Sequence, residues 1–496
     1  MTTSAKMTHR MRQLNYPMLL RVLGWLLLIE SMFLLLPVIT AMIYDEEDLR
    51  GFLFTAVTTL VIGLGLTTFL HPRRQEMGRQ EGFLLTASVW VVFSLFGMLP
   101  FILSSNPLSV SDAFFEAMSG FTTTGCSVLL SVEGMSHSIT IWRALMQWIG
   151  GMGIIMFTLA VLPMLNYSGG MQMFNAEVTG IIHEKLRPRI SSTAKVLWGI
   201  YVGLSVLLIV LLWIGPMDLF DSICHAFSAI STGGFSTRDN SLAYYNSDYI
   251  NIVVLVFMFL GGTSFALMYK IATGDPKALW RNDVFKAYLI IIALFYRMFL
   301  FALVKNGQSD DWRTLTIYPL FQIVSTITST GLSVCDFESW GPFILALIFV
   351  LMFTGACAGS TSGGAKIDRM LFLIKNTHNE LYRCVHPNAV TNVRVNGKAV
   401  PPTLVSKVIA FICIYIMIIA VGGIILTALG MPLIDSFFSA FSCVSNTGFG
   451  AGMTGQGAGF EIVPDAGKWI LSTLMLIGRL ELFTVLVLFT PDFWIK

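Results

Sequence analysis

The chain has 496 residues, of which only 12% are charged, while 55% are hydrophobic and 38 are Phe. Because an ordinary globular chain carries about 25% charged residues, this composition cannot cover a water-facing surface. The sequence therefore excludes a soluble protein and predicts an all-α polytopic membrane protein that has membrane lipid as a partner. The net charge is only +2, and the basic residues are not pooled in one patch, so we expect no nucleic-acid partner.

Cysteine and histidine are dispersed along the chain, with seven residues of each type. They form neither a CxxC pair nor a His-based zinc motif, so we expect no disulfide framework and no metal centre of that kind. The sequence contains no nucleotide-binding fingerprint and no catalytic motif. We therefore expect no organic cofactor in this chain and no enzyme activity.

Ten stretches of the sequence are long and apolar enough to cross a membrane, which takes about 20 residues in a helix. The predicted spans are 18–43, 52–71, 82–104, 138–164, 194–215, 248–272, 284–305, 339–375 (interrupted), 404–429 and 467–490. Most Lys and Arg residues lie at the span ends that this arrangement puts on one side. Because cytoplasmic loops are enriched in Lys and Arg, we expect both termini in the cytoplasm.

Four shorter apolar segments lie between these spans, and each has only about a dozen residues, too few to cross. Each begins near an acid or a Thr and ends in a Thr-Gly pair. The segments begin at Asp112, Asp221, Thr316 and Asp435 and end at Thr124-Gly125, Thr232-Gly233, Thr330-Gly331 and Thr447-Gly448. The pattern recurs after roughly 100 residues, which predicts four repeats of span, re-entrant pore helix and span.

These repeats divide the chain into a series of units. Residues 1–80 form a two-helix N-terminal unit, and the pore repeats cover 81–165, 194–275, 283–376 and 404–496. Residues 166–193 and 377–403 are predicted cytoplasmic linkers. The third repeat contains an interruption at 355–366.

The four Thr-Gly ends predict a ring that binds a cation. A permeating cation exchanges its water shell for backbone carbonyl oxygens that face one axis, and Gly adopts the positive φ angles that this geometry needs. A single Thr-Gly pair is more typical of a plain helix cap than of an ion site, so the prediction depends on the fourfold repetition. The predicted filter residues are Thr123, Thr124, Gly125, Ser231, Thr232, Gly233, Thr330, Gly331, Asn446, Thr447 and Gly448, with the carbonyls of the four Thr-Gly pairs as ligands of the cation.

Over nearly its whole length the chain resembles the Trk/Ktr/HKT superfamily of potassium transporters, most closely its TrkH-like bacterial members. The motifs that carry the resemblance include DAFFEAMSGFTTTG from Asp112, WIGGMG from Trp148, GACAGSTSGGAK from Gly355 and GRLE from Gly478. The fourth filter segment departs from the family pattern, because NTGFG from Asn446 stands where we expect Asn-Leu-Gly-Pro-Gly.

The resemblance implies potassium uptake across the cell inner membrane, with K⁺ as the transported ion. It also implies a homodimer with one pore in each protomer, and regulation by a cytoplasmic ring of TrkA-like subunits that bind NAD and adenine nucleotides. We expect such a partner to dock on the basic segments 165–195 and 366–407. An H⁺- or Na⁺-coupled secondary transporter remains the alternative function, because sequence does not separate coupled transport from a gated channel.

The small-residue stretch from Gly355 to Lys366 interrupts the predicted span 339–375. Its spacing fits either an intramembrane loop or a helix-packing stripe of small residues. The resemblance favours a loop beneath the filter and implies a gate. The predicted gate residues are Gly355, Gly359, Gly363, Gly364, Lys366 and Arg479.

Arg479 lies within the last predicted span, where a charge is costly and usually faces a wet cavity or a partner. As part of the gate, Arg479 would place a cation near the path of the ion. The alternative role is an ion pair with Glu481 or with a pore-helix acid.

Overall fold

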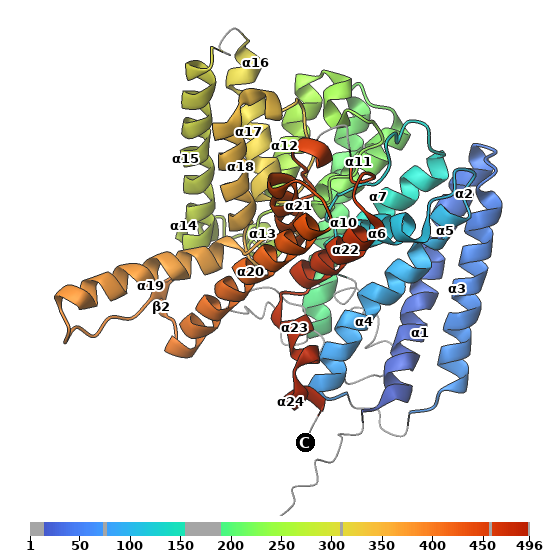
Figure 1. The fold of residues 1–496 in the computed structure, drawn as a ribbon, viewed down its shortest axis with the longest axis horizontal. Helices are drawn as coiled ribbons and strands as arrows, with labels where there is room; N and C mark the ends of the chain where they lie inside the picture. Colours follow the sequence, from blue (N-terminus) through green and yellow to red (C-terminus); the bar gives the residue numbers. More distant parts are fainter. Residues whose placement is uncertain (1–13, 73–76, 154–189, 308–310, 456–458, 495–496) are drawn as a thin grey trace, which may run out of the picture.

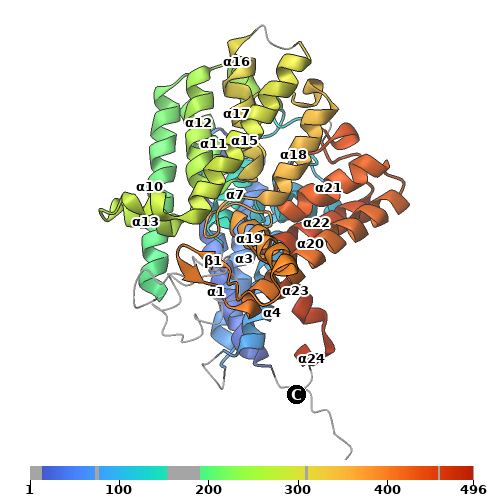
Figure 2. The same ribbon diagram turned by 90° about the vertical axis from the view of Figure 1, so that its left-hand side faces the viewer.

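A computed structural model describes residues 14–72, 77–153, 190–307, 311–455 and 459–494. The described chain consists of helices with one small antiparallel hairpin, β1 (Arg394–Val395) and β2 (Lys398–Ala399), as Figures 1 and 2 show. The predicted linker 166–193 and the end of the predicted span 138–164 lie almost wholly outside the described residues.

The N-terminal helices lie at one edge of the molecule (Figure 1), with α1 (Tyr16–Phe33) continued by α2 (Leu35–Ile43) and followed by α3 (Leu49–Phe69). Helices α1 and α3 pack closely because glycines face each other. A Cβ atom on Gly24 would lie 3.0 Å from the carbonyl oxygen of Gly63, so the backbones touch where side chains are absent.

Four groups of three helices follow, each with a first helix, a short helix and a second helix. The first helices are α4 (Arg79–Gly97) with α5 (Leu99–Ile102), α10 (Ile190–Ile214), α15 (Asp283–Lys305) and α20 (Pro402–Ala428). The short helices are α6 (Val110–Phe121), α11 (Leu219–Ser231), α17 (Ile317–Ile327) and α21 (Leu433–Ser445). The second helices are α7 (His137–Gly151), α12 (Asp248–Gly261), α18 (Pro342–Thr354) and α22 (Asp465–Arg479).

The remaining elements connect or extend these groups. They are η2 (Ser241–Tyr245), α13 (Phe265–Ala272), α14 (Lys277–Arg281), α16 (Trp312–Leu315), η3 (Glu338–Trp340), α19 (Ile367–Val385), η4 (Gly452–Thr454), α23 (Phe483–Leu486), η5 (Val487–Phe489) and α24 (Pro491–Trp494).

The second helix of each group packs against the short helix of the next group. The contacts join α7 to α11, α12 to α17, α18 to α21 and α22 to α6, so the fourth group closes on the first. The short helices lie inside this arrangement, and most of their side chains are buried. The packing therefore brings four segments that are far apart in the sequence to one centre.

The first turn of each short helix contains a residue type that favours the start of a helix. Asp112, Asp221 and Asp435 lie in the first turn of α6, α11 and α21, where the positive end of the helix dipole favours an acid. Helix α17 has no acid there and begins after Thr316 with Pro319 in its first turn, as expected from its sequence.

Two predicted spans are wrong in shape. Six helices in the described chain are long and apolar enough to cross a membrane, and eight if two bent pairs each count as one span. The predicted span 248–272 bends by 101° between α12 and α13, and the predicted span 467–490 bends by 111° after α22. The chain stays largely apolar through the second break, from Leu480 to Phe483, so hydropathy alone indicated a continuous helix.

Candidate functional site

Each short helix ends in a segment with the same backbone conformation. Two residues with positive φ flank one central residue in each segment. The pairs are Thr123 (54°) and Gly125 (86°), Thr232 (55°) and Gly234 (90°), Ser329 (52°) and Gly331 (83°), and Asn446 (52°) and Gly448 (82°). Since non-Gly residues rarely adopt positive φ, four such pairs at equivalent places indicate a shared constraint.

The central residue of each segment is tied back to its own short helix in the same way. Its N–H donates to the carbonyl oxygen of the residue five positions earlier. The bonds are Thr124 to Ser119 (2.9 Å), Gly233 to Ser228 (2.9 Å), Thr330 to Ser325 (2.8 Å) and Thr447 to Ser442 (3.0 Å).

The four segments touch one another in a closed ring. A Cβ atom added to each positive-φ glycine would lie within 3.0 Å of a carbonyl oxygen in a neighbouring segment. These clashes are Gly125 with Gly233, Gly234 with Thr330, Gly331 with Thr447, and Gly448 with Thr124. The ring therefore requires glycine at these places for space as well as for φ.

The predicted register of the second segment is wrong by one residue. Gly234, not Gly233, has the positive φ and the neighbour contact that Gly125, Gly331 and Gly448 have in the other segments. Gly233 takes the central place, which a Thr occupies elsewhere. Two adjacent glycines left the sequence pattern ambiguous here, and the Thr-Gly pattern favoured the first.

The fourth segment keeps the common backbone despite its different sequence. Asn446 donates from Nδ2 to Thr124 Oγ1 (2.9 Å) and to the Met475 carbonyl oxygen (3.0 Å), so its side chain joins the fourth segment to the first. The buried Phe449 ring packs edge-on against Phe337, with 5.2 Å between ring centroids. The fourth segment therefore has the same backbone conformation as the other three although its sequence departs from the expected pattern.

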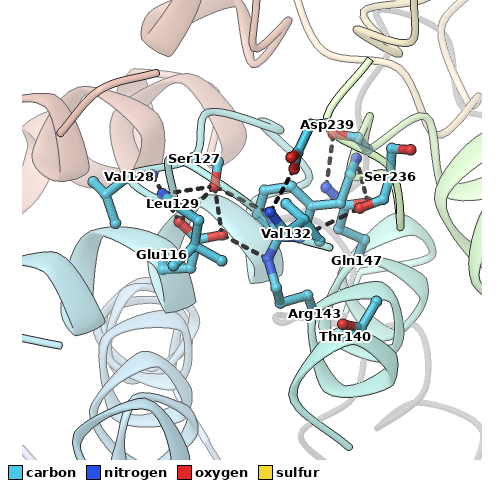
Figure 3. A network of polar contacts seen from close by, with 12 residues as sticks. Glu116, Ser127, Val128, Leu129, Val132, Thr140, Arg143, Gln147, Ser236 and Asp239 are labelled. Atoms are coloured by element: carbon cyan, nitrogen blue, oxygen red, sulfur yellow. Dashed lines mark hydrogen bonds and ion pairs between the residues drawn. The ribbon is translucent and has the colours of Figure 1, made fainter. Parts of the chain in front are cut away.

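A buried ion pair supports the first segment from behind (Figure 3). Arg143 of α7 donates from Nε to Glu116 Oε1 of α6 at 2.7 Å, and both side chains are at most 2% exposed. The Glu116 carboxylate also accepts from Ser127 Oγ (3.0 Å) and from the Val128 N–H (3.0 Å). Arg143 donates further to Ser127 Oγ, so the pair is well satisfied by hydrogen bonds.

This pair was missed in the sequence. The available signal was that Arg143 lies within a predicted span and Glu116 within a predicted pore helix, where charged residues usually pair. The guanidinium also lies over the Phe235 ring, 4.1 Å from its centroid. Arg143 therefore connects the chain after the first segment with the chain after the second.

The loop above the second segment has its own polar anchor. Arg238 Nη2 lies 2.8 Å from Asp221 Oδ2, and the hydroxyl of Tyr245 donates to the same oxygen. Burial raises the pKa of Tyr245, and its hydrogen bond to Asp221 adds to this increase. Tyr245 thus stays protonated and acts as a donor to the start of α11.

The stretch 355–366 is a loop, so the continuous helix-packing interpretation is wrong. Helix α18 ends at Thr354 and α19 begins at Ile367. Three glycines of this loop and Lys366 have positive φ angles, which an α-helix does not allow. They are Gly355 (62°), Gly359 (75°), Gly364 (74°) and Lys366 (70°).

This loop contacts three of the four filter segments. Thr361 Oγ1 donates to the Ile230 carbonyl oxygen (3.1 Å) and accepts from Thr232 Oγ1 (3.3 Å) in the second segment. The Gly363 N–H donates to Ser329 Oγ (2.5 Å) in the third. A Cβ atom on Gly363 would clash with the Ser445 carbonyl oxygen in the fourth, so Gly363 is also a close-approach position.

Arg479 joins the same loop to the end of α7. Its Nη1 donates to the Thr361 carbonyl oxygen (3.0 Å), and its Nη2 donates to the Gly150 carbonyl oxygen (2.5 Å). The ion pair of Glu481 is made by Arg369 Nη2 of α19 at 2.5 Å. The predicted gate residues around Thr361 therefore lie together against the filter.

Lys366 is a second cation in this group. Its side chain is buried, and its Nζ donates back to the Ser362 carbonyl oxygen of the same loop. Gly355, Gly359, Gly363 and Gly364 permit the tight backbone, while Lys366 and Arg479 supply positive charge.

Comparison with known proteins assigns the family. The family model "TrkH: Cation transport protein" matches residues 50–303 and 313–494. The chain is 37% identical to the Trk system potassium uptake protein TrkH of Salmonella typhimurium, over 97% of this chain and 100% of that protein. It is 36% identical to the protein of the same name from Escherichia coli K12, with the same coverage.

A solved structure agrees with the fold. The crystal structure of the potassium transporter TrkH from Vibrio parahaemolyticus matches with a TM-score of 0.87 and 35% sequence identity, over 97% of this chain and 100% of that one. The predicted all-α polytopic membrane fold and the resemblance are thereby confirmed. The chain belongs to the TrkH family of cation transport proteins.

Proposed function

We propose that this chain takes up potassium ions across the cell membrane through the ring of four filter segments. The observation that carries this proposal is the closed set of contacts from Gly125 through Gly234 and Gly331 to Gly448. Backbone carbonyls in such a ring can replace the water shell of a weakly hydrated cation. The relatives from Salmonella typhimurium and Escherichia coli are named potassium uptake proteins, which supports K⁺ as the ion.

We expect K⁺ and Rb⁺ to pass more readily than Na⁺. All four ring positions hold glycine, and the resemblance to the Trk/Ktr/HKT superfamily implies that a Ser at such a position would accompany Na⁺ preference. The carbonyls that would bind K⁺ belong to Thr124, Gly125, Gly233, Gly234, Thr330, Gly331, Thr447 and Gly448.

The loop 355–366 and Arg479 form the proposed gate. The loop touches the second, third and fourth segments, and Arg479 holds it to the end of α7 beside the first. A guanidinium about 6 Å from a passing cation opposes it by about 2.8 kcal/mol at an effective dielectric constant of about 20. The glycines allow the loop a second conformation at small cost, so it can move aside.

We also propose that a separate cytoplasmic nucleotide-binding subunit opens this gate and that the chain acts as a homodimer. Helix α19 and the hairpin β1–β2 extend from the helical body (Figure 1). Lys375 of α19 binds Asp283 (3.2 Å) and the Arg394 carbonyl oxygen (2.8 Å), which fixes the hairpin to α15. Because α19 directly follows the loop 355–366, a partner that docks on α19 can displace the loop.

The test is ion flux into proteoliposomes that contain the purified protein, with the membrane potential clamped. We expect Rb⁺ and K⁺ flux well above Na⁺ flux. Equal flux of Na⁺ and K⁺ would contradict the proposal. Flux that follows opposing H⁺ or Na⁺ gradients at fixed potential would instead support the ion-coupled alternative.

A further inference from the structure

Three of the four filter segments share a side-chain tether that supports the central residue. The hydroxyls of Thr122 and Thr124 lie 2.7 Å apart in the first segment, and those of Thr328 and Thr330 lie 2.7 Å apart in the third. In the fourth, Ser445 and Thr447 are 2.8 Å apart. The earlier hydroxyl of each pair donates to a carbonyl of the short helix, so the central Thr donates to it and is tied to that helix.

The second segment keeps only the first half of this tether. Ser231 Oγ still donates to the Ser228 carbonyl oxygen at 3.1 Å. The central residue, however, is Gly233, which has no hydroxyl to complete the link. A different group must therefore hold this quarter of the ring.

Gln147 of α7 occupies the missing side-chain position. A Cβ atom on Gly233 would lie 2.5 Å from Gln147 Oε1 and 2.9 Å from Gln147 Cβ, so the Gln side chain fills that space. Its Nε2 donates to the Gly233 carbonyl oxygen at 2.7 Å, and its Oε1 accepts from the Phe235 N–H at 3.1 Å. The fully buried amide of Gln147 (Figure 3) is thus hydrogen-bonded to the backbone on both sides of Gly234.

The next second helix has no such group at the matching place. Gly151 of α7 packs against Ser231, and Gly262 after α12 packs against Thr328, the equivalent residue of the next segment. Four residues before these glycines, α7 has Gln147 and α12 has the buried Met258. Beside the third segment, which has its own Thr, α12 has the apolar Met258 at this place, and beside the second segment, which lacks the Thr, α7 supplies an amide.

We infer that Gln147 is a positioning residue for ion selectivity, which holds the second quarter of the filter in place of the missing threonine. This assignment rests on the proposed function, because it concerns the geometry of the same ring. Without the amide, the Gly233 carbonyl and the Phe235 N–H lose buried hydrogen bonds, and Gly234 is free to leave the ring geometry.

The experiment compares three variants in the proteoliposome flux assay. Gln147→Met keeps the volume and removes both bonds, and we expect the K⁺/Na⁺ permeability ratio to fall about tenfold. Gly233→Thr alone should lower the K⁺/Na⁺ permeability ratio about as much, because the new side chain clashes with Gln147. The double variant Gln147→Ala, Gly233→Thr should return to within about threefold of the unmodified ratio, since the introduced threonine hydroxyl can then bond to the hydroxyl of Ser231.

The control is Tyr415→Phe, which removes a buried hydroxyl that has no hydrogen-bond partner among the described residues. Its permeability ratio should equal that of the unmodified protein. Hydrogen exchange gives a readout that does not depend on transport: the Phe235 amide should be protected in the unmodified protein and exchange faster in Gln147→Met.

Two results would overturn the inference. One is an unchanged permeability ratio and unchanged Phe235 exchange in a well-folded Gln147→Met protein. The other is a double variant no better than Gly233→Thr alone. Failure of the proposed function is distinguishable from both, because the unmodified protein itself would then fail to prefer K⁺.

Discussion

The four filter segments and the described ends of three second helices differ in how far they repeat. The segments have the same pair of positive φ angles and the same hydrogen bond back to the short helix in every quarter. The second helices leave the filter differently: α12 turns by 101°, α22 by 111°, and α18 runs into the loop 355–366. The backbone is therefore repeated at the proposed filter and varied at the proposed gate.

The largest expected effect concerns the repeated part of the molecule, where a buried ion pair supports the first filter segment. Replacing Arg143 by Leu leaves the Glu116 carboxylate buried without its cation, which should cost about 3–5 kcal/mol of stability. Thermal unfolding of the purified protein in detergent should show a clear fall in melting temperature. The double variant Arg143→Leu, Glu116→Gln should recover part of it, and a melting temperature that is the same for Arg143→Leu and the unmodified protein would contradict this role.

The second prediction concerns the part that varies between the repeats, namely the loop 355–366 and Arg479. Replacing Arg479 by Ala, or shortening the stretch from Gly355 to Gly364, should raise basal K⁺ flux, because both changes weaken the proposed block. Removing about 2.8 kcal/mol of repulsion would raise the flux up to about a hundredfold. Lower basal flux in both well-folded variants would show that these residues only support packing.

The third prediction tests the requirement for glycine in the ring. Gly125→Ser places a side chain against the Gly233 carbonyl oxygen and forces a Ser to φ of 86°. Strain of about 1–3 kcal/mol should reduce the K⁺/Na⁺ ratio about tenfold or more. Gly203→Ser is the matched control, because Gly203 lies in α10 with no atom within 4 Å of an added Cβ, and it should leave Rb⁺ uptake by potassium-uptake-deficient cells unchanged.

The smallest expected effect on flux comes from a change on α19, outside the ring. Leu381 and Tyr382 are exposed on α19 (64% and 47%). Replacing Leu381 by Asp should weaken binding of a nucleotide-binding partner about tenfold, as expected for an apolar contact residue, and leave basal flux unaltered. Cysteine crosslinking to the partner should also succeed from 366–407 and fail from 270–286. Crosslinks confined to 71–81 and 270–286 would contradict this surface.

The repeated features could be predicted from sequence, because each is local. In a short apolar run that begins with Asp112 or Asp435 and ends in Thr-Gly, the acid predicts the start of the helix and the Thr-Gly pair predicts the turn after it. The loop at Gly355 could be predicted only through the family resemblance, because the spacing of its glycines fits a helix-packing stripe as well as a loop.

The features that sequence missed depend on contacts between distant residues. Gly233 and Gly234 are distinguished by contacts with other repeats, because Gly233 contacts Gln147 and Gly234 contacts Thr330. The pairing of Arg143 with Glu116 and of Arg369 with Glu481 likewise requires the packed helices. The bend after α22 is hidden because apolar residues continue through it, although Glu481 (55°) and Leu482 (40°) have positive φ.

The measurement that tests the central claim most directly is anomalous scattering from Rb⁺ or Tl⁺ in crystals of the purified protein. The account predicts an ion peak inside the ring made by the segments at Gly125, Gly234, Gly331 and Gly448, reduced when K⁺ competes and unaffected by the same concentration of Na⁺. A ring without ion density, in crystals that show the ion elsewhere along the chain, would contradict the account.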